Sequence, residues 1–256
     1  MKLSDLQKLQ ASVILAHLGA LAGLILWWEP AWLWLSLAAH LAFLWLGHDL
    51  YHHRYLSHRS FEMPVWLQRI CAVLGIYCLF GTPIGIAATH FLHHRHADTD
   101  ADPHPAREGW RAWCWTYTGM QMRDRATVAR LSADPWLRFI SKHYFMIYFS
   151  TVFLAGAVNP RLAIYGFLVP AVYAFFSNGL VNVVCHRWGY RRYATPDHSR
   201  NSLIVNVALF FGGIALHNNH HSNPKACYLS RAWYEIDMVG CIAKAIHRHT
   251  LAHNES

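Results

Sequence analysis

The chain has 256 residues, of which 54% are hydrophobic and 14% are charged. Because soluble proteins average about 25% charged residues, this balance predicts a membrane protein and leaves little room for a second, soluble domain. The formal net charge is +8, but no basic tract interleaved with aromatic residues is present, so the sequence argues against nucleic acid as a partner.

Four apolar segments approach the length of about 20 residues that a helix needs to cross a bilayer. Glu29-Pro30 separates the first two and Asn159-Pro160-Arg161 separates the last two, so we expect two helical hairpins with very short connections. The four predicted spans are residues 11–28, 31–47, 144–158 and 162–184. We expect residues 48–143 and 185–256 to form a helical cap, so that residues 1–256 make one membrane domain.

Three histidine clusters lie just outside these apolar segments, and imidazole is the commonest side-chain ligand for transition metals. The clusters are His53 and His58; His90, His93 and His94; and His217, His220 and His221. Residues i, i+3 and i+4 share a helix face, so the second and third clusters should each converge on one point. Each cluster can then supply ligands to one or both members of a metal pair. The first pair is five residues apart, roughly 140° around a helix, which predicts a helix end or turn. Eight imidazoles are too many for one zinc ion and suit two metal ions placed close together.

The other histidines lack this clustering. We interpret six of them as structural or interfacial and two as hydrogen-bond partners; these are His17, His40, His48, His52, His143 and His198, and then His96 and His104.

A fifth apolar stretch, residues 65–88, is long enough to cross the membrane but would then place His53 and His90 on opposite sides. A shared metal site forbids that. Polar residues, glycines and a proline also interrupt the stretch, which favours a segment that lies at the membrane surface or dips in and returns. The same reasoning applies to residues 202–216.

The distribution of Lys and Arg residues predicts which side of the membrane carries the histidine clusters. Of the 22 Lys and Arg residues, only Arg161 lies in the two hairpin connections. By the positive-inside rule, the side with both termini and the histidines is cytoplasmic. The six cysteines form no CxxC pair, which fits a reducing compartment.

Carboxylates should accompany the histidines, because two metal ions held by neutral imidazoles leave a strongly positive site. Candidates that could orient the rings are Asp98 and Asp102 after the second cluster and Glu235 and Asp237 after the third, with Asp49 and Asp100 as further possibilities.

Four sequence motifs together resemble the membrane fatty acid desaturases. They are HRYLSHRSF at residues 53–61, HFLHHRHADTDADPHPAREG at 90–109, NVVCHRWGYRRY at 182–193, and HNNHH followed by WYEID within 217–237. The resemblance is greatest to the acyl-CoA desaturase branch, which includes stearoyl-CoA and bacterial delta-9 desaturases, and it covers most of the chain.

The resemblance implies an all-α membrane protein with four transmembrane helices under a cytosolic cap that holds two iron ions, with dioxygen as co-substrate. It adds His186 as a ninth ligand and Asn182 as a residue that reaches iron through water. It also implies a bacterial inner membrane location. The chain carries no appended haem domain, so we expect electrons from a separate protein such as ferredoxin or a flavin or haem reductase.

The expected reaction introduces a cis double bond into a long saturated acyl chain, carried by coenzyme A or by a phospholipid; an acyl-carrier protein is also open. One alternative is a hydroxylase or ketolase of the same superfamily, since desaturation and hydroxylation share the first hydrogen abstraction. Another is a metal-binding or transport protein. That alternative predicts ionisable residues inside the spans, and residues 144–158 and 162–184 contain none apart from their boundary.

Overall fold

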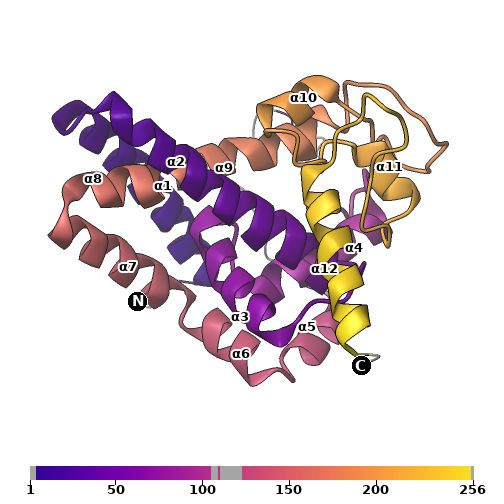
Figure 1. The fold of residues 1–256 in the computed structure, drawn as a ribbon, viewed down its shortest axis with the longest axis horizontal. Coiled ribbons are helices and arrows are strands. Elements are labelled where there is room, and N and C mark those ends of the chain that lie inside the picture. The colour runs from indigo at the N-terminus through magenta and orange to yellow at the C-terminus, as the bar shows by residue number, and fades with distance from the viewer. Residues whose placement is uncertain (1–3, 105–108, 110–122, 255–256) are drawn as a thin grey trace.

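The computed structural model describes residues 4–104, 109 and 123–254, and nearly all of their regular structure is helical. Figure 1 shows long helices gathered at one end of the molecule and shorter ones at the other. The shorter helices are α3 (Val65–Leu74), α4 (Pro83–His96), α5 (Arg125–Leu131), α6 (Pro135–Lys142), α10 (Leu203–Ala208) and α11 (His217–Ser222), with the longer α12 (Met238–Asn254) beside them. The predicted cap residues 105–108 and 110–122 lie outside the described residues.

The first hairpin consists of α1 (Asp5–Leu26) and a 28-residue helix, Pro30–Ser57, that contains α2 (Leu33–His40) and η2 (Leu41–Ser57). The helix α1 begins earlier than the predicted residue 11. Ser4 accepts a hydrogen bond from the Gln7 N–H while the Gln7 side chain accepts one from the Ser4 N–H, a capping box that satisfies two free backbone donors. The second helix continues ten residues beyond the predicted end at residue 47 and carries the first histidine cluster.

The second hairpin consists of α7 (Tyr144–Val158) and a 25-residue helix, Pro160–Val184, that contains α8 (Pro160–Ala163), η6 (Ile164–Leu168), α9 (Val169–Gly179) and η7 (Leu180–Val184). Asn159 turns the chain, because its side-chain oxygen accepts a hydrogen bond of 2.9 Å from the Arg161 N–H, and Pro160 suits the first turn of a helix.

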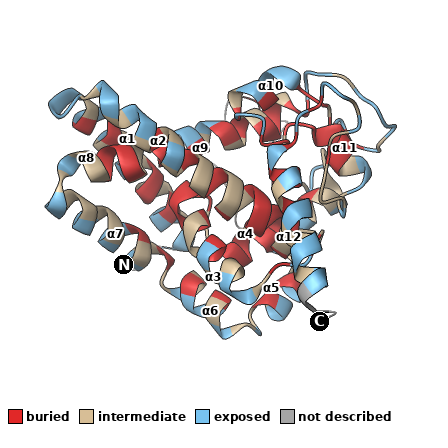
Figure 2. Ribbon diagram, viewed as in Figure 1, coloured by how far each residue is buried: buried red, intermediate tan, exposed pale blue. Residues whose placement is uncertain are grey.

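Three helices in the described part of the chain are long and apolar enough to cross a membrane: Asp5–Leu26, Pro30–Ser57 and Pro160–Val184. The predicted bounds of α7 match the structure, but its 15 residues fall short of the usual length of about 20. Length and composition therefore support three of the four predicted spans. Both α1 and α7 carry exposed apolar residues, including Leu21, Ile25 and Phe153, as expected for surfaces that face lipid. Figure 2 colours parts of both helices as exposed.

Residues 65–96 form a broken helix pair. The helices Val65–Cys78 and Pro83–His96 meet at a bend of 78°, with positive φ angles at Leu79 and Gly81. At the far end of this pair the His90 Nε2 atom lies 2.8 Å from the His58 Nε2 atom. This contact brings the second helix of the pair back beside the end of the helix Pro30–Ser57. That residues 65–88 do not cross the membrane stays a prediction. In residues 202–216, α10 has six residues, too few to cross.

The helix Pro30–Ser57 touches the broken pair backbone to backbone. A Cβ atom added at Gly47 would overlap the backbone of Leu74 and Gly75, and one added at Gly75 would overlap the ring of His52. This close approach fixes where η2 lies along α3, and therefore where the first histidine cluster lies.

We expect Gly47→Ala to lower the free energy of unfolding by about 1–3 kcal/mol, the usual cost of overpacking. Thermal unfolding of the detergent-solubilised protein measures the effect. Gly156→Ala is the matched control, because its new Cβ would meet only the Ala163 Cβ at an ordinary 3.5 Å. A Gly47→Ala protein as stable as the control would contradict this packing.

Candidate metal centre

Nine histidines from four parts of the chain meet between the cap and the long helices. They form two groups, and within each group one ring nitrogen from every histidine lies within 4.8 Å of the others. The five-histidine group is His53, His58, His90, His94 and His220, and the four-histidine group is His93, His186, His217 and His221. All eight clustered histidines and His186 therefore lie where a pair of metal ions would need them.

The clusters divide between the groups in a way that helix periodicity alone did not predict. His90 and His94 point to the five-histidine group, whereas His93 belongs to the four-histidine group. The three rings of an HxxHH cluster thus do not converge on one point, and each cluster instead supplies both groups, the second of the two arrangements that the sequence allowed. Residues i and i+4 are about 40° apart around a helix, while i+3 lies about 60° to the other side. Because of this angular difference, α4 and α11 each direct histidines to both groups.

The first cluster depends on unusual helix geometry. The segment η2 is wound as a π-helix, with hydrogen bonds from residue i to i+5, and the His58 N–H donates to the His53 carbonyl at 3.2 Å. This wider turn brings residues five apart onto one face. The sequence predicted a turn or helix end here, and the helix does end at Ser57, but the π winding explains why both rings reach the same group.

The ring nitrogens face one another at short range. In the five-histidine group the His220 Nε2 atom lies 3.0 Å from that of His53 and 2.8 Å from that of His94. In the four-histidine group the His221 Nε2 atom lies 3.1 Å from that of His217 and 3.3 Å from that of His93.

These nitrogens are lone-pair donors. His93 and His221 each give their Nδ1–H to a carboxylate, of Asp102 at 2.9 Å and Asp197 at 2.8 Å. A neutral ring with a proton on Nδ1 has none on Nε2, so the two Nε2 lone pairs face each other, which is favourable only around a cation. Imidazole nitrogens lie about 2.0–2.1 Å from a bound divalent metal, so two ligands at right angles are about 3.0 Å apart. The nine residues fit two metal ions.

Burial keeps these imidazoles neutral. It lowers the pKa of His58 to about 3 and holds the pKa values of His90, His94, His217 and His220 well below 6.5, with neighbouring histidines adding to the effect. Because a metal ion binds the deprotonated ring, the rings are in their ligand form at neutral pH.

Four carboxylates accept hydrogen bonds from ring Nδ1–H groups, on the side of each imidazole away from the Nε2 atoms that face one another. Asp98 and Asp102, both candidates from the sequence, accept from the Nδ1–H groups of His186 and His93, each at 2.9 Å. Asp49, a further candidate, accepts from the His53 Nδ1–H at 3.0 Å. The fourth, Asp197, was missed, because it lies 24 residues before its partner His221 in a polar loop without periodicity.

Burial alone would raise the pKa of Asp98, but hydrogen bonds from His186 and the His198 N–H outweigh it and bring that pKa to about 2.

Two predicted carboxylates act elsewhere. Among the described residues, neither Glu235 nor Asp237 hydrogen-bonds to a ring of the two groups, which corrects the expectation that they orient histidines directly. Glu235 accepts from the Asn219 side chain at 3.1 Å, and Asp237 pairs with the buried Arg54 at 2.9 Å. Asp100 is exposed. Glu235 and Asp237 therefore contact the histidine-bearing segments through the side chains of Asn219 and Arg54.

The two asparagines of HNNHH brace the loop that carries Asp197. The Asn218 side-chain oxygen accepts from the N–H groups of Arg192 and Tyr193, each at 2.8 Å. Asn219 accepts from the Asn201 side chain at 2.8 Å and donates to the Leu229 carbonyl at 2.9 Å. Both side chains are fully buried, so they position α11 rather than contact a ligand.

Comparison with known proteins agrees with the histidine pattern. Residues 14–254 match the family model described as fatty acid desaturase. The chain belongs to the fatty acid desaturase family.

Several characterised desaturases are similar over most of their length. An sn-1 stearoyl-lipid 9-desaturase of Anabaena variabilis is 30% identical, with 93% of this chain and 89% of the relative aligned. A delta-9 acyl-lipid desaturase of Arabidopsis thaliana is 31% identical over 94% of this chain and 79% of the relative. An acyl-CoA 5-desaturase of Anemone leveillei is 30% identical over 86% and 70%.

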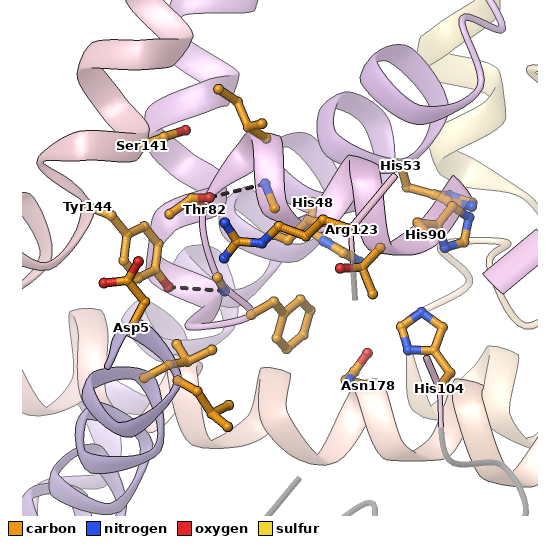
Figure 3. A pocket seen from close by; sticks show the side chains of 18 of the residues that line it. Asp5, His48, His53, Thr82, His90, His104, Arg123, Ser141, Tyr144 and Asn178 are labelled. Carbon is orange, nitrogen blue, oxygen red and sulfur yellow. Dashed lines mark hydrogen bonds between the residues drawn. The ribbon is translucent and has the colours of Figure 1, made fainter. Parts of the chain in front are cut away.

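A cavity of about 850 Å³ adjoins the histidines of this desaturase-family protein. Its wall includes His53, His90 and His217 together with Asn182, whose side chain donates to Asn178 at 2.9 Å. Figure 3 shows His53, His90 and His104 at one end and Asp5, Ser141 and Tyr144 at the other. The cavity thus connects the candidate metal centre with the starts of α1 and α7.

Three histidines interpreted as structural do remain outside the two groups. His40 packs against Tyr173, His52 is buried beside Gly75, and His48 packs edge-on against Phe80 while it borders the cavity. His104 also borders the cavity, with its ring centroid 4.6 Å from that of His93.

We expect His220→Ala to reduce bound metal from two ions per chain to one or none, because the His220 ring touches both His53 and His94. Elemental analysis of the purified protein measures the loss. His143→Ala is the control, since this ring packs at a tilt against Phe139 outside both groups. Undiminished metal in His220→Ala would refute the grouping.

Proposed function

We propose that this protein is an oxygen-dependent fatty acyl desaturase that introduces a cis double bond into a long saturated acyl chain. The observation that carries the proposal is the meeting of nine histidines in two groups beside a large cavity. Membership of the desaturase family supports an oxidoreductase, and relatives named as acyl-lipid and acyl-CoA desaturases support an acyl substrate.

We assign the metal-ligand role to all nine histidines, with Asn182 reaching the centre through water. When bound, two iron ions would supply the redox chemistry that activates dioxygen and removes two hydrogens from adjacent carbons. The imidazoles supply neutral donors and leave room for dioxygen, and the carboxylates behind them keep the rings in place.

The protein's own contribution is to hold the acyl chain still. Leu44 and Val181 are buried side chains in the cavity wall, and Ile84 lines it from α4. These apolar side chains would exclude water from the part of the cavity beside the histidines and fix which carbons lie next to them, and such positioning accounts for much of the acceleration in enzymes.

The carrier of the acyl chain is coenzyme A or a phospholipid. Lys8 and Lys142 line the cavity at the beginning of α1 and the end of α6. Their positive charge suits the phosphate that both carriers contain.

We further propose four transmembrane helices, with α7 as the fourth, under a cap on the cytoplasmic side of a bacterial inner membrane. The concentration of Lys and Arg outside the hairpin connections supports this orientation. Electrons would come from a separate donor such as ferredoxin or a flavin or haem reductase.

Expression in a desaturase-deficient host, with mass spectrometry of the lipids, tests the proposed reaction. We expect a new monounsaturated acyl chain that requires oxygen and disappears in His94→Ala. A hydroxylated main product would indicate the hydroxylase instead, and no product with a full complement of iron would indicate a metal-binding role.

Narrowing the cavity should change the substrate range. We expect Val181→Phe to lower conversion of the longest acyl chain by at least about tenfold, because one added ring fills space beside the histidines, while bound iron stays unchanged. Val158→Phe, on the exposed end of α7, is the control. An unaltered chain-length profile in Val181→Phe would show that the acyl chain lies elsewhere.

A further inference from the structure

The two histidine groups differ in the charge around them. In the four-histidine group, three of the four rings hydrogen-bond to separate carboxylates. These pairs are His93 with Asp102, His186 with Asp98, and His221 with Asp197, at 2.9, 2.9 and 2.8 Å. All three pairs are almost entirely removed from solvent.

The five-histidine group has far less negative charge. In the part of the chain that the structure describes, Asp49 is the one carboxylate that hydrogen-bonds to a ring of this group. The same carboxylate also accepts from Arg54 at 3.0 Å and 3.2 Å. Arg54 is 1% exposed, and its one positive charge is shared between Asp49 and Asp237.

Arg54 is held in this place by a closed set of acceptors. Its guanidinium donates to Asp237 at 2.9 and 3.0 Å and to the carbonyls of Cys227 and Gly212 at 2.7 and 3.4 Å. Asp237 in turn accepts from backbone N–H groups, including that of Gly240 at 2.8 Å. Two carboxylates and one guanidinium leave this network with a net charge of −1, against −3 from Asp98, Asp102 and Asp197 in the other group.

We propose that the four-histidine group is the tighter of the two metal sites and fills first, and that Asp98, Asp102 and Asp197 make it so. This inference rests on the proposed two-metal function. A carboxylate behind a ligand histidine typically changes metal affinity by 10–100-fold, and burial strengthens its attraction for a cation. The fifth imidazole of the other group opposes the effect, but one neutral ligand is set against a difference of two buried negative charges.

Asp98→Asn tests whether the carboxylate charge makes the four-histidine group the tighter metal site. Asp98 Oδ2 accepts from both the His186 Nδ1–H and the His198 N–H, at 2.9 and 2.7 Å. An asparagine oxygen at this position can keep both hydrogen bonds, while the charge and the longer 3.1 Å contact of Oδ1 with His186 are lost. Asp100→Asn is the matched control, because it removes the same charge from an exposed side chain on the same turn.

The experiment is a Co²⁺ titration of the full-length, metal-stripped protein in detergent without oxygen, followed by visible absorption. We expect two steps in the wild type and in Asp100→Asn, with the tighter step missing in His217→Ala and the weaker step missing in His58→Ala. In Asp98→Asn the tighter step should weaken 10–100-fold while the other is unchanged. Asp197→Asn serves as a second charge variant if Asp98→Asn fails to fold.

Equal affinities in the wild type, or weakening of the other step in Asp98→Asn, would overturn the assignment of the tighter site. Binding of a single Co²⁺, or of none, in the folded wild type would instead count against the two-metal function itself. The two failures are therefore distinguishable.

Discussion

The structure depends on one constraint: nine imidazole nitrogens point their lone pairs inward at separations near 3 Å. Such an arrangement is repulsive unless cations lie within it and unless each ring is kept from turning away. The Nδ1–H bonds to Asp49, Asp98, Asp102 and Asp197 supply that restraint for four rings. The fold around the site keeps each carboxylate within hydrogen-bond distance of its ring.

That support comes from segments far apart in sequence. Arg54 ties η2 to the start of α12 through Asp237, and Asn218 and Asn219 tie α11 to the loop of residues 190–201. Removing one partner of such a buried network leaves an unpaired polar group, which is costly. The cap is therefore rigid where it carries ligands, and the cavity beside it can position an acyl chain against a fixed centre.

Much of this could be predicted from sequence because the relevant signals are local. Two hairpins follow from apolar runs broken by Asn-Pro or Glu-Pro, and the HxxHH spacing marks metal chemistry. The division of His93 from His90 and His94 could not be predicted, since it depends on where a second site lies. The π winding at His53 and His58 and the pairing of Asp197 with His221 depend on tertiary contacts. His186 stood out only through the family resemblance.

Graded loading with iron tests the central claim most directly. Purified protein carrying from zero to two Fe²⁺ per chain would be given a saturated acyl substrate and one exposure to dioxygen, without an electron donor. Two ferrous ions supply the two electrons that, with the two from the substrate, reduce dioxygen to water. The account predicts about one double bond for each chain that holds two ions and none for chains that hold one. Full conversion at one iron per chain would contradict it.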